Sequence, residues 1–139
     1  MINKYLKKII AQSHSDLQVI SACCSESKVK ISNIKYLAKS KIFLLLIERK
    51  SIEKDNYERK IRSIIKFDFI DDSKSKNINQ SNPDYILELL AIDLLKKENN
   101  YEIILLFSNN AFITLRAEII EVTLEDQKEI DDQNIWMQR

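Results

Sequence analysis

Residues 42–49 read IFLLLIER and residues 61–70 read IRSIIKFDFI, and these two stretches decide the fold class of the chain. The first is a continuous apolar run of the kind expected for a strand buried on both faces. In the second, Ile61, Ser63, Ile65, Phe67 and Phe69 share one side, and Arg62, Lys66 and Asp68 share the other. Because successive side chains of a strand point to opposite faces, this alternation predicts a half-exposed β-strand.

Strand patterns continue over most of the remaining chain. We predict further strands at Lys4–Gln12, Lys28–Ser32, Ile34–Ala38, Tyr101–Phe107 and Phe112–Leu124. Within the last of these, the inward phase shifts by one residue near Ile119–Ile120. That shift predicts a β-bulge or a sharp bend.

The segment Tyr85–Leu95 fits a helix as well as a strand, because it contains good helix formers and few β-branched residues. The polar residues Lys97–Asn100 follow it and lead into the strand predicted at Tyr101–Phe107. Two such segments joined by a short turn are typical of a hairpin, and we therefore favour a strand.

One segment has helical periodicity. From Ser15 to Cys24, the inward positions are Leu17, Ile20, Ser21 and Cys24, which follow the spacing of one helix face. Ser15 and Gln18 predict a capping box at its start. We predict loops at Lys50–Glu58 and Asp71–Pro83, and a turn at Ser108–Asn110 in which Asn adopts the left-handed conformation.

These patterns predict an α+β fold, mainly antiparallel β, with seven or so strands and one short N-terminal helix. The expected architecture is a curled sandwich or open barrel, with a pleckstrin-homology-like curl as one form that the strand count fits. We expect one globular domain over residues 1–127, since nothing marks a domain boundary. Residues 128–139 are expected to form an acidic tail, frayed or weakly helical from Glu125 onward, in which Trp136 folds back on the core or docks a partner.

The chain of 139 residues contains no glycine, although ordinary usage of about 7% would give roughly ten. P-loops, dinucleotide-binding fingerprints and hydrolase nucleophile elbows all need glycine where the backbone approaches a ligand or adopts positive φ. The composition therefore excludes these three classes of enzyme site.

No pattern predicts a catalytic residue, a metal ligand set or a cofactor. His14 is the only histidine, and a helix between them would hold it about 13 Å from Cys23 and Cys24. Vicinal cysteines and one imidazole do not supply a tetrahedral zinc site. Acidic pairs such as Asp71–Asp72 are expected to be solvated rather than to bind a cation. An enzyme whose polar groups converge only in three dimensions stays as an alternative.

Charge is distributed unevenly along the chain. Residues 1–66 carry fifteen Lys and Arg against six Asp and Glu, a net charge of +9, whereas residues 67–139 carry seven against fifteen, a net charge of −8. We expect Arg59, Arg62 and Lys66 to form the centre of a basic face, with lysines of the preceding hairpin beside them. Such a face suits an acidic protein partner.

The function expected from these features is a non-enzymatic binding or scaffold module, which uses the basic face or a sheet edge. A second copy of the chain is the other expected partner, because a sheet edge offers main-chain pairing. Few aromatic side chains accompany the basic residues, which argues against nucleic acid as the partner.

No targeting or membrane-spanning segment is predicted. The apolar residues of Met1–Ile10 are interrupted by three lysines, and the longest apolar stretch, Ile42–Ile47, is far shorter than the 20 or so residues that cross a bilayer. Two adjacent cysteines fit a reducing compartment. We therefore expect a cytoplasmic bacterial protein.

Four segments of the chain resemble a bacterial family known as Domain of Unknown Function twenty-nine forty-eight. They are residues 16–49, 58–70, 87–92 and 107–127, which read DLQVISACCSESKVKISNIKYLAKSKIFLLLIER, ERKIRSIIKFDFI, LELLAI and FSNNAFITLRAEIIEVTLEDQ. The resemblance implies a single-domain bacterial protein without an assigned reaction. This chain departs from the family pattern at the Ser108–Asn110 turn, at Ile119 and at Lys66, where the family has glycines, a cysteine and a histidine, so the resemblance transfers no site residue.

Overall fold

The computed structural model describes residues 6–52 and 56–130. Its elements along the chain are β1 Lys8–Ala11, α1 His14–Cys24, β2 Ser27–Lys30, η1 Ile31–Asn33, β3 Ile34–Leu37, η2 Ala38–Ser40, β4 Ile42–Ile52, β5 Glu58–Phe67, β6 Ile70–Lys76, β7 Ile86–Lys96, β8 Tyr101–Phe107, β9 Phe112–Ala117 and β10 Val122–Ile130. All ten strands join one sheet, and every pairing is antiparallel.

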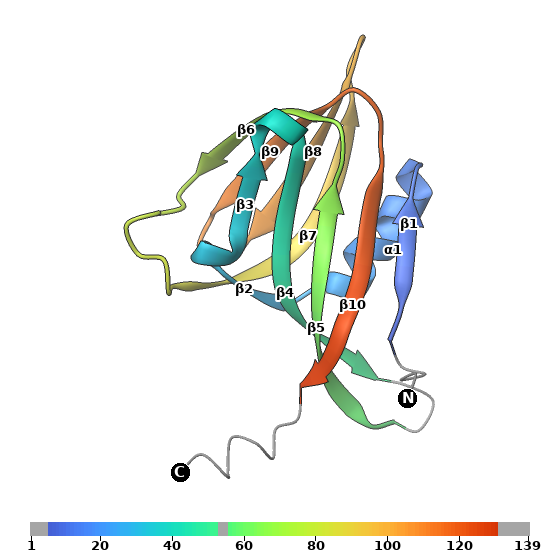
Figure 1. Cartoon of the computed structure of the whole chain (residues 1–139), viewed down its shortest axis with the longest axis vertical. Helices are drawn as coiled ribbons and strands as arrows, with labels where there is room; N and C mark the ends of the chain where they lie inside the picture. Colours follow the sequence, from blue (N-terminus) through green and yellow to red (C-terminus); the bar gives the residue numbers. More distant parts are fainter. Residues whose placement is uncertain (1–5, 53–55, 131–139) are drawn as a thin grey trace.

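The sheet order is β1-β10-β5-β4-β2-β7-β8-β9-β6, and β3 adds to the side of β4. Figure 1 shows how this sheet bends back on itself, so that β7, β8 and β9 lie behind β4, β5 and β10. The short strand β2 connects the two layers, and α1 packs against β7 and β1. The predicted α+β fold, mainly antiparallel and curled, is confirmed; the sheet is not closed into a barrel.

The core lies between the two layers. Odd-numbered residues of β4 and β5 point inward, and Phe43 and Phe67 meet edge to face with ring centroids 5.9 Å apart. Burial of each such side chain contributes about 1.5–3 kcal/mol. The even-numbered residues of β4, such as Leu44 and Leu46, stay partly exposed, so the prediction that this strand is buried on both faces is wrong. The outer side of β4 has no second layer to cover it.

Helix α1 buries Leu17, Ile20 and Cys24, as its periodicity predicts. Its cap is Ser13 rather than Ser15: the Asp16 backbone N–H donates to Ser13 Oγ at 3.2 Å. The Asp16 carboxylate in turn accepts the Gln12 backbone N–H at 3.4 Å. The predicted cap at Ser15 is wrong because Ser13 lies directly before the first helical residue and its hydroxyl accepts the Asp16 N–H.

Two predicted loops contain strand. β4 continues to Ile52 and so includes the first three residues of the loop predicted from Lys50. β6 occupies Ile70–Lys76, where a loop was predicted from Asp71. Its sequence is polar because it lies at the sheet edge and pairs on one side only, with β9. Only the backbone pairing with β9 identifies this segment as a strand, because its residues do not alternate between apolar and polar side chains.

Phe69 was predicted on the inner side of the β5 strand, and this prediction is wrong. β5 ends at Phe67. Phe69 lies in the turn before β6 with φ of 59° and an exposed fraction of 40%. Its carbonyl accepts the Glu118 backbone N–H at 3.3 Å, which ties the turn to the chain beyond β9.

The C-terminal third largely follows the prediction. Tyr85–Leu95 contains a strand, β7, which forms a hairpin with β8. The predicted bend near Ile119–Ile120 is confirmed, because β9 ends at Ala117 and β10 begins at Val122. β10 then continues to Ile130, so the frayed or helical tail predicted from Glu125 is wrong for these residues: they pair with β5.

The chain has no glycine, so other residues take the backbone positions with positive φ. Among the described residues, Asn56, Asn77, Asn109 and Asn110 take four of the seven positive-φ positions. Asn tolerates this conformation better than other side chains, and the turn predicted at Ser108–Asn110 is confirmed.

Four predictions concern residues outside those described or are not tested by them. The docking or folding back of Trp136 and the ends of the predicted tail lie outside the described residues. The division into residues 1–127 and 128–139 stays a prediction, as does the pleckstrin-homology-like form of the curl.

Candidate functional site

The structure separates the three basic residues that the sequence grouped together. Arg62 is exposed and Lys66 partly exposed on the outer side of β5. Arg59 is at an odd-numbered, inward position and is 8% exposed. Its Nε lies 3.4 Å from Glu129 Oε1, and its guanidinium stacks over the Tyr57 ring at 4.9 Å. Arg62 and Lys66 are therefore available to a partner, and Arg59 is held by its neighbours.

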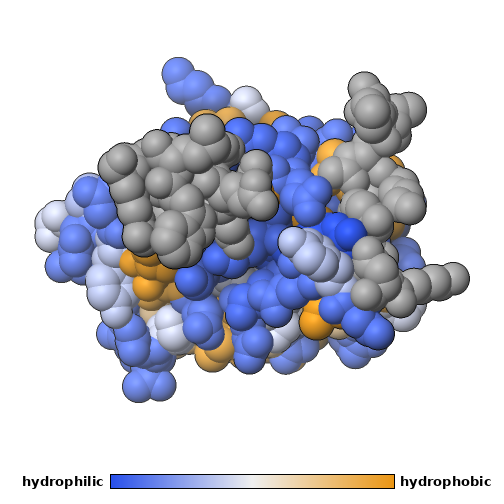
Figure 2. Space-filling view, turned by 90° about the horizontal axis from the view of Figure 1, so that it is seen from below, coloured by the Kyte–Doolittle hydropathy of each residue, from blue (hydrophilic) through white to orange (hydrophobic). Residues whose placement is uncertain are grey.

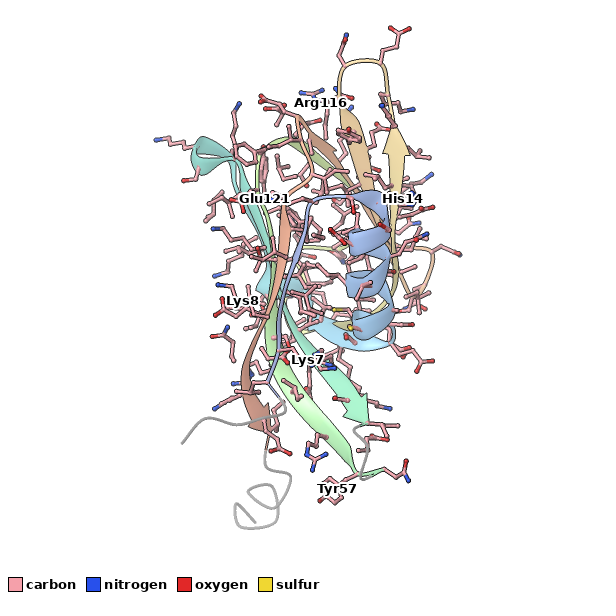
Figure 3. All side chains as sticks on the ribbon, turned by 90° about the vertical axis from the view of Figure 1, so that its right-hand side faces the viewer. Lys7, Lys8, His14, Tyr57, Arg116 and Glu121 are labelled. Carbon is pink, nitrogen blue, oxygen red and sulfur yellow. The ribbon has the colours of Figure 1, made fainter. Side chains whose placement is uncertain are left out.

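Arg62 and Lys66 belong to a larger basic surface, which we call the outer face. It is the side of β1, β10, β5, β4, β2 and β3 that points away from the core. Strand register places nine cations there: Lys8, Lys28, Lys30, Lys35, Lys50, Lys60, Arg62, Lys66 and Lys128. At the described positions of these strands, the carboxylates on the same side are Glu48, Glu58 and Glu125. Figure 3 shows Lys8 on the side of the sheet away from α1.

A hollow of about 170 Å³ interrupts the outer face between β2 and β4. It exists because β2 pairs with β4 only at Lys28 and Glu48, so the two strands diverge on either side of this point. Lys28, Lys30, Arg62 and the carboxylate of Glu48 line the hollow around Leu46. A concave spot with an apolar base and a rim of three cations and one carboxylate can receive a single side chain of a partner, and its cations can pair with carboxylates beside that side chain.

The carboxylates near this face compensate only part of its charge. The contact of Lys66 with Asp68 is long, 3.7 Å from Nζ to Oδ1, and Lys66 is half exposed. Ion pairs of this kind contribute about 0–1 kcal/mol and are screened by salt. None of the outward positions in the described strands of this face carries an aromatic ring, so the face lacks the stacking platforms of single-strand nucleic-acid sites.

A second polar group lies on the inner side of the same strands. The Arg49 guanidinium donates to both Asp126 carboxylate oxygens, at 2.9 Å from Nε and 2.6 Å from Nη2. Ser63 Oγ donates to Asp126 Oδ1 at 2.6 Å, and the Lys7 backbone N–H donates to Oδ2 at 2.8 Å. We call this group the buried ion pair, because the Arg49 and Asp126 side chains are 3% and 0% exposed.

Both charges of the buried ion pair are stabilised. Burial by itself would raise the pKa of the Asp126 carboxyl, but hydrogen bonds from Arg49, Ser63 and Lys7 outweigh it and hold this pKa below its usual value. Burial would lower the pKa of the Arg49 guanidinium, and the Asp126 carboxylate raises it again. With every Asp126 oxygen engaged, the carboxylate is a structural acceptor and not a proton carrier.

The sequence reasoning did not single out Arg49 or Asp126, although a signal was present. The inward phase of β4 runs Phe43, Leu45, Ile47 and then Arg49. The inward phase of β10 reaches Asp126 in the same way, two residues after Leu124. A cation and a carboxylate on inward positions of strands that flank β5 could have indicated a buried pair.

The cysteines and the histidine do not meet. His14 is the first residue of α1 and Cys24 the last, and Figure 3 shows His14 at one end of this helix. Eleven helical residues span about 15 Å. Burial raises the pKa of the Cys24 thiol to about 12, and the nearby Arg49 lowers it only in part. A thiol with this pKa is not a nucleophile at neutral pH.

Residues 6–52 and 56–130 contain no group of three His, Cys, Asp or Glu side chains placed to hold a metal ion. No helix within those ranges has the length and apolar character to span a bilayer. Seen from below, the described surface is mostly hydrophilic with scattered hydrophobic spots, as Figure 2 shows. The described part of this face therefore presents no large apolar patch.

Comparison with known proteins gives one match. The model of a family described as "Protein of unknown function (DUF2948)" matches residues 7–134. No curated protein matches the chain. No solved structure matches it either.

Proposed function

This chain belongs to the DUF2948 family, whose function is unknown, and we propose that it is a non-enzymatic module that binds an acidic protein partner through its outer face. The observation that carries the proposal is the concentration of nine cations against three carboxylates on that face, with the hollow around Leu46 among them. In the proposal, Lys28, Lys30 and Arg62 pair with carboxylates of the partner.

The hollow supports a protein partner over a free anion. Its base is Leu46, and Ile86 contributes to its wall. An apolar side chain of the partner would bury these residues, while acidic residues on either side of it would meet the cationic rim. Interfaces commonly combine such a central apolar contact with charged pairs that steer association.

The proposal places the protein in a bacterial cytoplasm, which the two free cysteines, Cys23 and Cys24, support. A second copy of the chain is a less favoured partner, because two outer faces of the same positive charge repel each other. Nucleic acid would meet the same cations and is separated from an acidic protein by experiment.

The test uses a charge reversal on the outer face and a matched reversal elsewhere. Lys30→Glu with Arg62→Glu removes two cations beside the hollow. Lys74→Glu with Lys96→Glu makes the same change in charge at exposed positions of β6 and β7. The probe is a synthetic peptide rich in Glu with one Leu, titrated into the isotopically labelled protein.

We expect the peptide to shift backbone NMR signals of β2, β4 and β5, with an affinity that falls as salt rises. The outer-face variant should lose about tenfold or more in affinity, and the matched variant should change it by much less. Equal losses in both variants, or shifts confined to other strands, would contradict the proposal. Tighter binding of a single-stranded DNA than of the peptide would assign the face to nucleic acid instead.

A further inference from the structure

The sheet has an opening between β3 and β6. β3 pairs only with β4, and β6 pairs only with β9. At one end of the opening the two strands are tied together, because Tyr36 Oη donates to the Ile70 carbonyl at 2.9 Å. The Ile70 N–H also donates to the Lys41 carbonyl at 2.8 Å. In Figure 1 the two strands diverge from this point, and the segment after β6 swings out beyond β3.

The segment between β6 and β7 closes the other end of the opening. The Ser32 N–H donates to the Pro83 carbonyl at 2.9 Å, and the Ile31 N–H donates to the Tyr85 carbonyl at 3.0 Å. The opening is therefore bounded by backbone on every side. A bounded opening of this kind persists without a ligand, as small-molecule sites usually do.

Behind the opening lies a cavity of about 380 Å³, which we call the β3–β6 cavity. Its size is within the range of about 300–1,000 Å³ found for ligand pockets. Apolar side chains form its inner wall, among them Ile31, Ile34, Phe43, Ile78 and Ile113. Its polar lining is provided by Ser32, Tyr36, Ser73, Ser75 and Gln80.

The serines of β6 are in register with inward residues of β9, but they are less buried than those residues: Ser73 is partly exposed and Ser75 is exposed. Ser73 pairs in register with Leu115, and Ser75 pairs with Ile113. Both partners are buried and inward. Leucine or isoleucine at these two positions would fill the cavity. Serine leaves it open and adds hydroxyl groups to its wall.

These hydroxyl groups are not used within the protein. Among residues 6–52 and 56–130, the side chains of Ser32, Ser73, Ser75 and Gln80 make no hydrogen bond to another protein group. They can donate to and accept from a molecule in the cavity. None of the described residues that line the cavity is charged, so a charged ligand would lose its hydration without gaining an ion pair from them.

We infer that the β3–β6 cavity binds an uncharged, planar small molecule with hydrogen-bonding groups along its edge. Its faces would pack against Phe43 and the isoleucines, and its edge would meet the hydroxyl groups of Ser73, Ser75 and Ser32. Tyr36 and Phe43, whose ring centroids are 6.3 Å apart at an interplanar angle of 40°, offer aromatic surface to a planar ligand. The lining includes exposed side chains, Ser32, Ser75 and Gln80, as well as buried ones, and none of the lining residues belongs to the outer face.

The test is a titration of the full chain with small probes. Uracil, nicotinamide and indole are the uncharged probes, and benzoate and benzylamine are charged probes of similar size. The readout is the methyl NMR signals of Ile34, Ile78 and Ile113. Ser73→Leu fills the cavity, and Lys74→Leu introduces the same side chain one residue later, on the exposed side of β6.

We expect at least one uncharged probe to shift all three methyl signals in a saturable way, and the charged probes to leave them unchanged. Ser73→Leu should weaken this binding about tenfold or more, whereas Lys74→Leu should preserve it. If Ser73→Leu does not fold, Ser75→Val provides the same test with a smaller side chain. Absence of saturable shifts for all uncharged probes would overturn the inference, and so would equal binding by the filled variant or by the charged probes.

Discussion

Polar side chains occupy inward register positions in two regions of this protein, and only one of the two regions buries them and satisfies their hydrogen bonds. Around Asp126, the guanidinium of Arg49, the hydroxyl of Ser63 and the Lys7 backbone N–H all donate to one carboxylate. Around the β3–β6 cavity, Ser73 and Ser75 line open space. Each serine lies on the inner side of its strand, yet only Ser63 has a protein partner.

The difference distinguishes a polar group that holds the fold from one that is available to a ligand. A buried group with all its hydrogen bonds made rigidifies its surroundings, and removing one member leaves the others unpaired. A polar group beside open space can be removed with little effect on the fold. Ser63 is fully buried, whereas Ser73 is partly exposed and Ser75 is exposed, so burial and hydrogen bonding together separate the two roles in this molecule.

The largest expected effect comes from breaking the buried ion pair. Asp126→Asn removes the negative charge that compensates Arg49, and we expect the free energy of unfolding to fall by about 3–5 kcal/mol because the guanidinium stays buried without its counter-ion. Urea denaturation followed by circular dichroism measures this change.

Asp71→Asn is the matched control for that substitution. Asp71 Oδ1 lies 3.0 Å from Lys41 Nζ, but this pair is at the surface, with the two side chains 22% and 51% exposed. We expect a loss of about 0–1 kcal/mol. Similar losses in the two variants would contradict the structural role given to the buried ion pair.

The buried ion pair also predicts how stability depends on acid. The pKa of Asp126 is lower in the folded protein than its ordinary value, which is about 3.9 in an unfolded chain. Its stabilising contribution is therefore fully present above about pH 4 and is lost as the pH falls through the lower, folded-state pKa.

We expect Asp126→Asn to remove this part of the acid dependence. The gap in unfolding free energy between the original protein and the variant should be constant from neutral pH to about pH 5 and should narrow below pH 4. Denaturant titrations at several pH values measure the gap. A gap that widens as the pH falls would show that Asp126 is not the carboxylate held ionised by the fold.

Much of this fold can be predicted from alternation alone. The inward phase of β5, with Ile61, Ile65 and Phe67, is visible in the sequence and is buried in the structure. The bend after Ala117 is also visible in the sequence, because the inward positions shift by one residue there and a bend or a β-bulge is needed to produce that shift. These predictions succeed where apolar side chains mark one face of a strand.

The failures fall where polar residues occupy strands. β6 reads IDDSKSK and carries no apolar alternation after Ile70, so only its backbone pairing with β9 identifies it. The inward positions of Arg49 and Asp126 continue visible phases, but pairing them requires knowing that β4 and β10 flank β5. The order of the strands in the sheet cannot be read from one sequence alone.

The basic face was predicted in part. Arg62 and Lys66 are on one side of β5 as the alternation requires, whereas Arg59 differs from them by an odd number of residues and points to the other side. The hollow between β2 and β4 was outside the reach of the sequence, because it depends on the single pairing of Lys28 with Glu48.

The comparison between the two regions is tested most directly by one pair of substitutions, Ser63→Ala and Ser73→Ala, measured by urea denaturation. Each removes one inward hydroxyl group from a strand of the same sheet. Ser63→Ala should lower the unfolding free energy by about 1.5–3 kcal/mol, because its hydroxyl donates to a buried carboxylate. Ser73→Ala should change it by no more than about 0.5 kcal/mol. Equal losses, or a larger loss for Ser73→Ala, would mean that the hydroxyl groups of the cavity also hold the fold together.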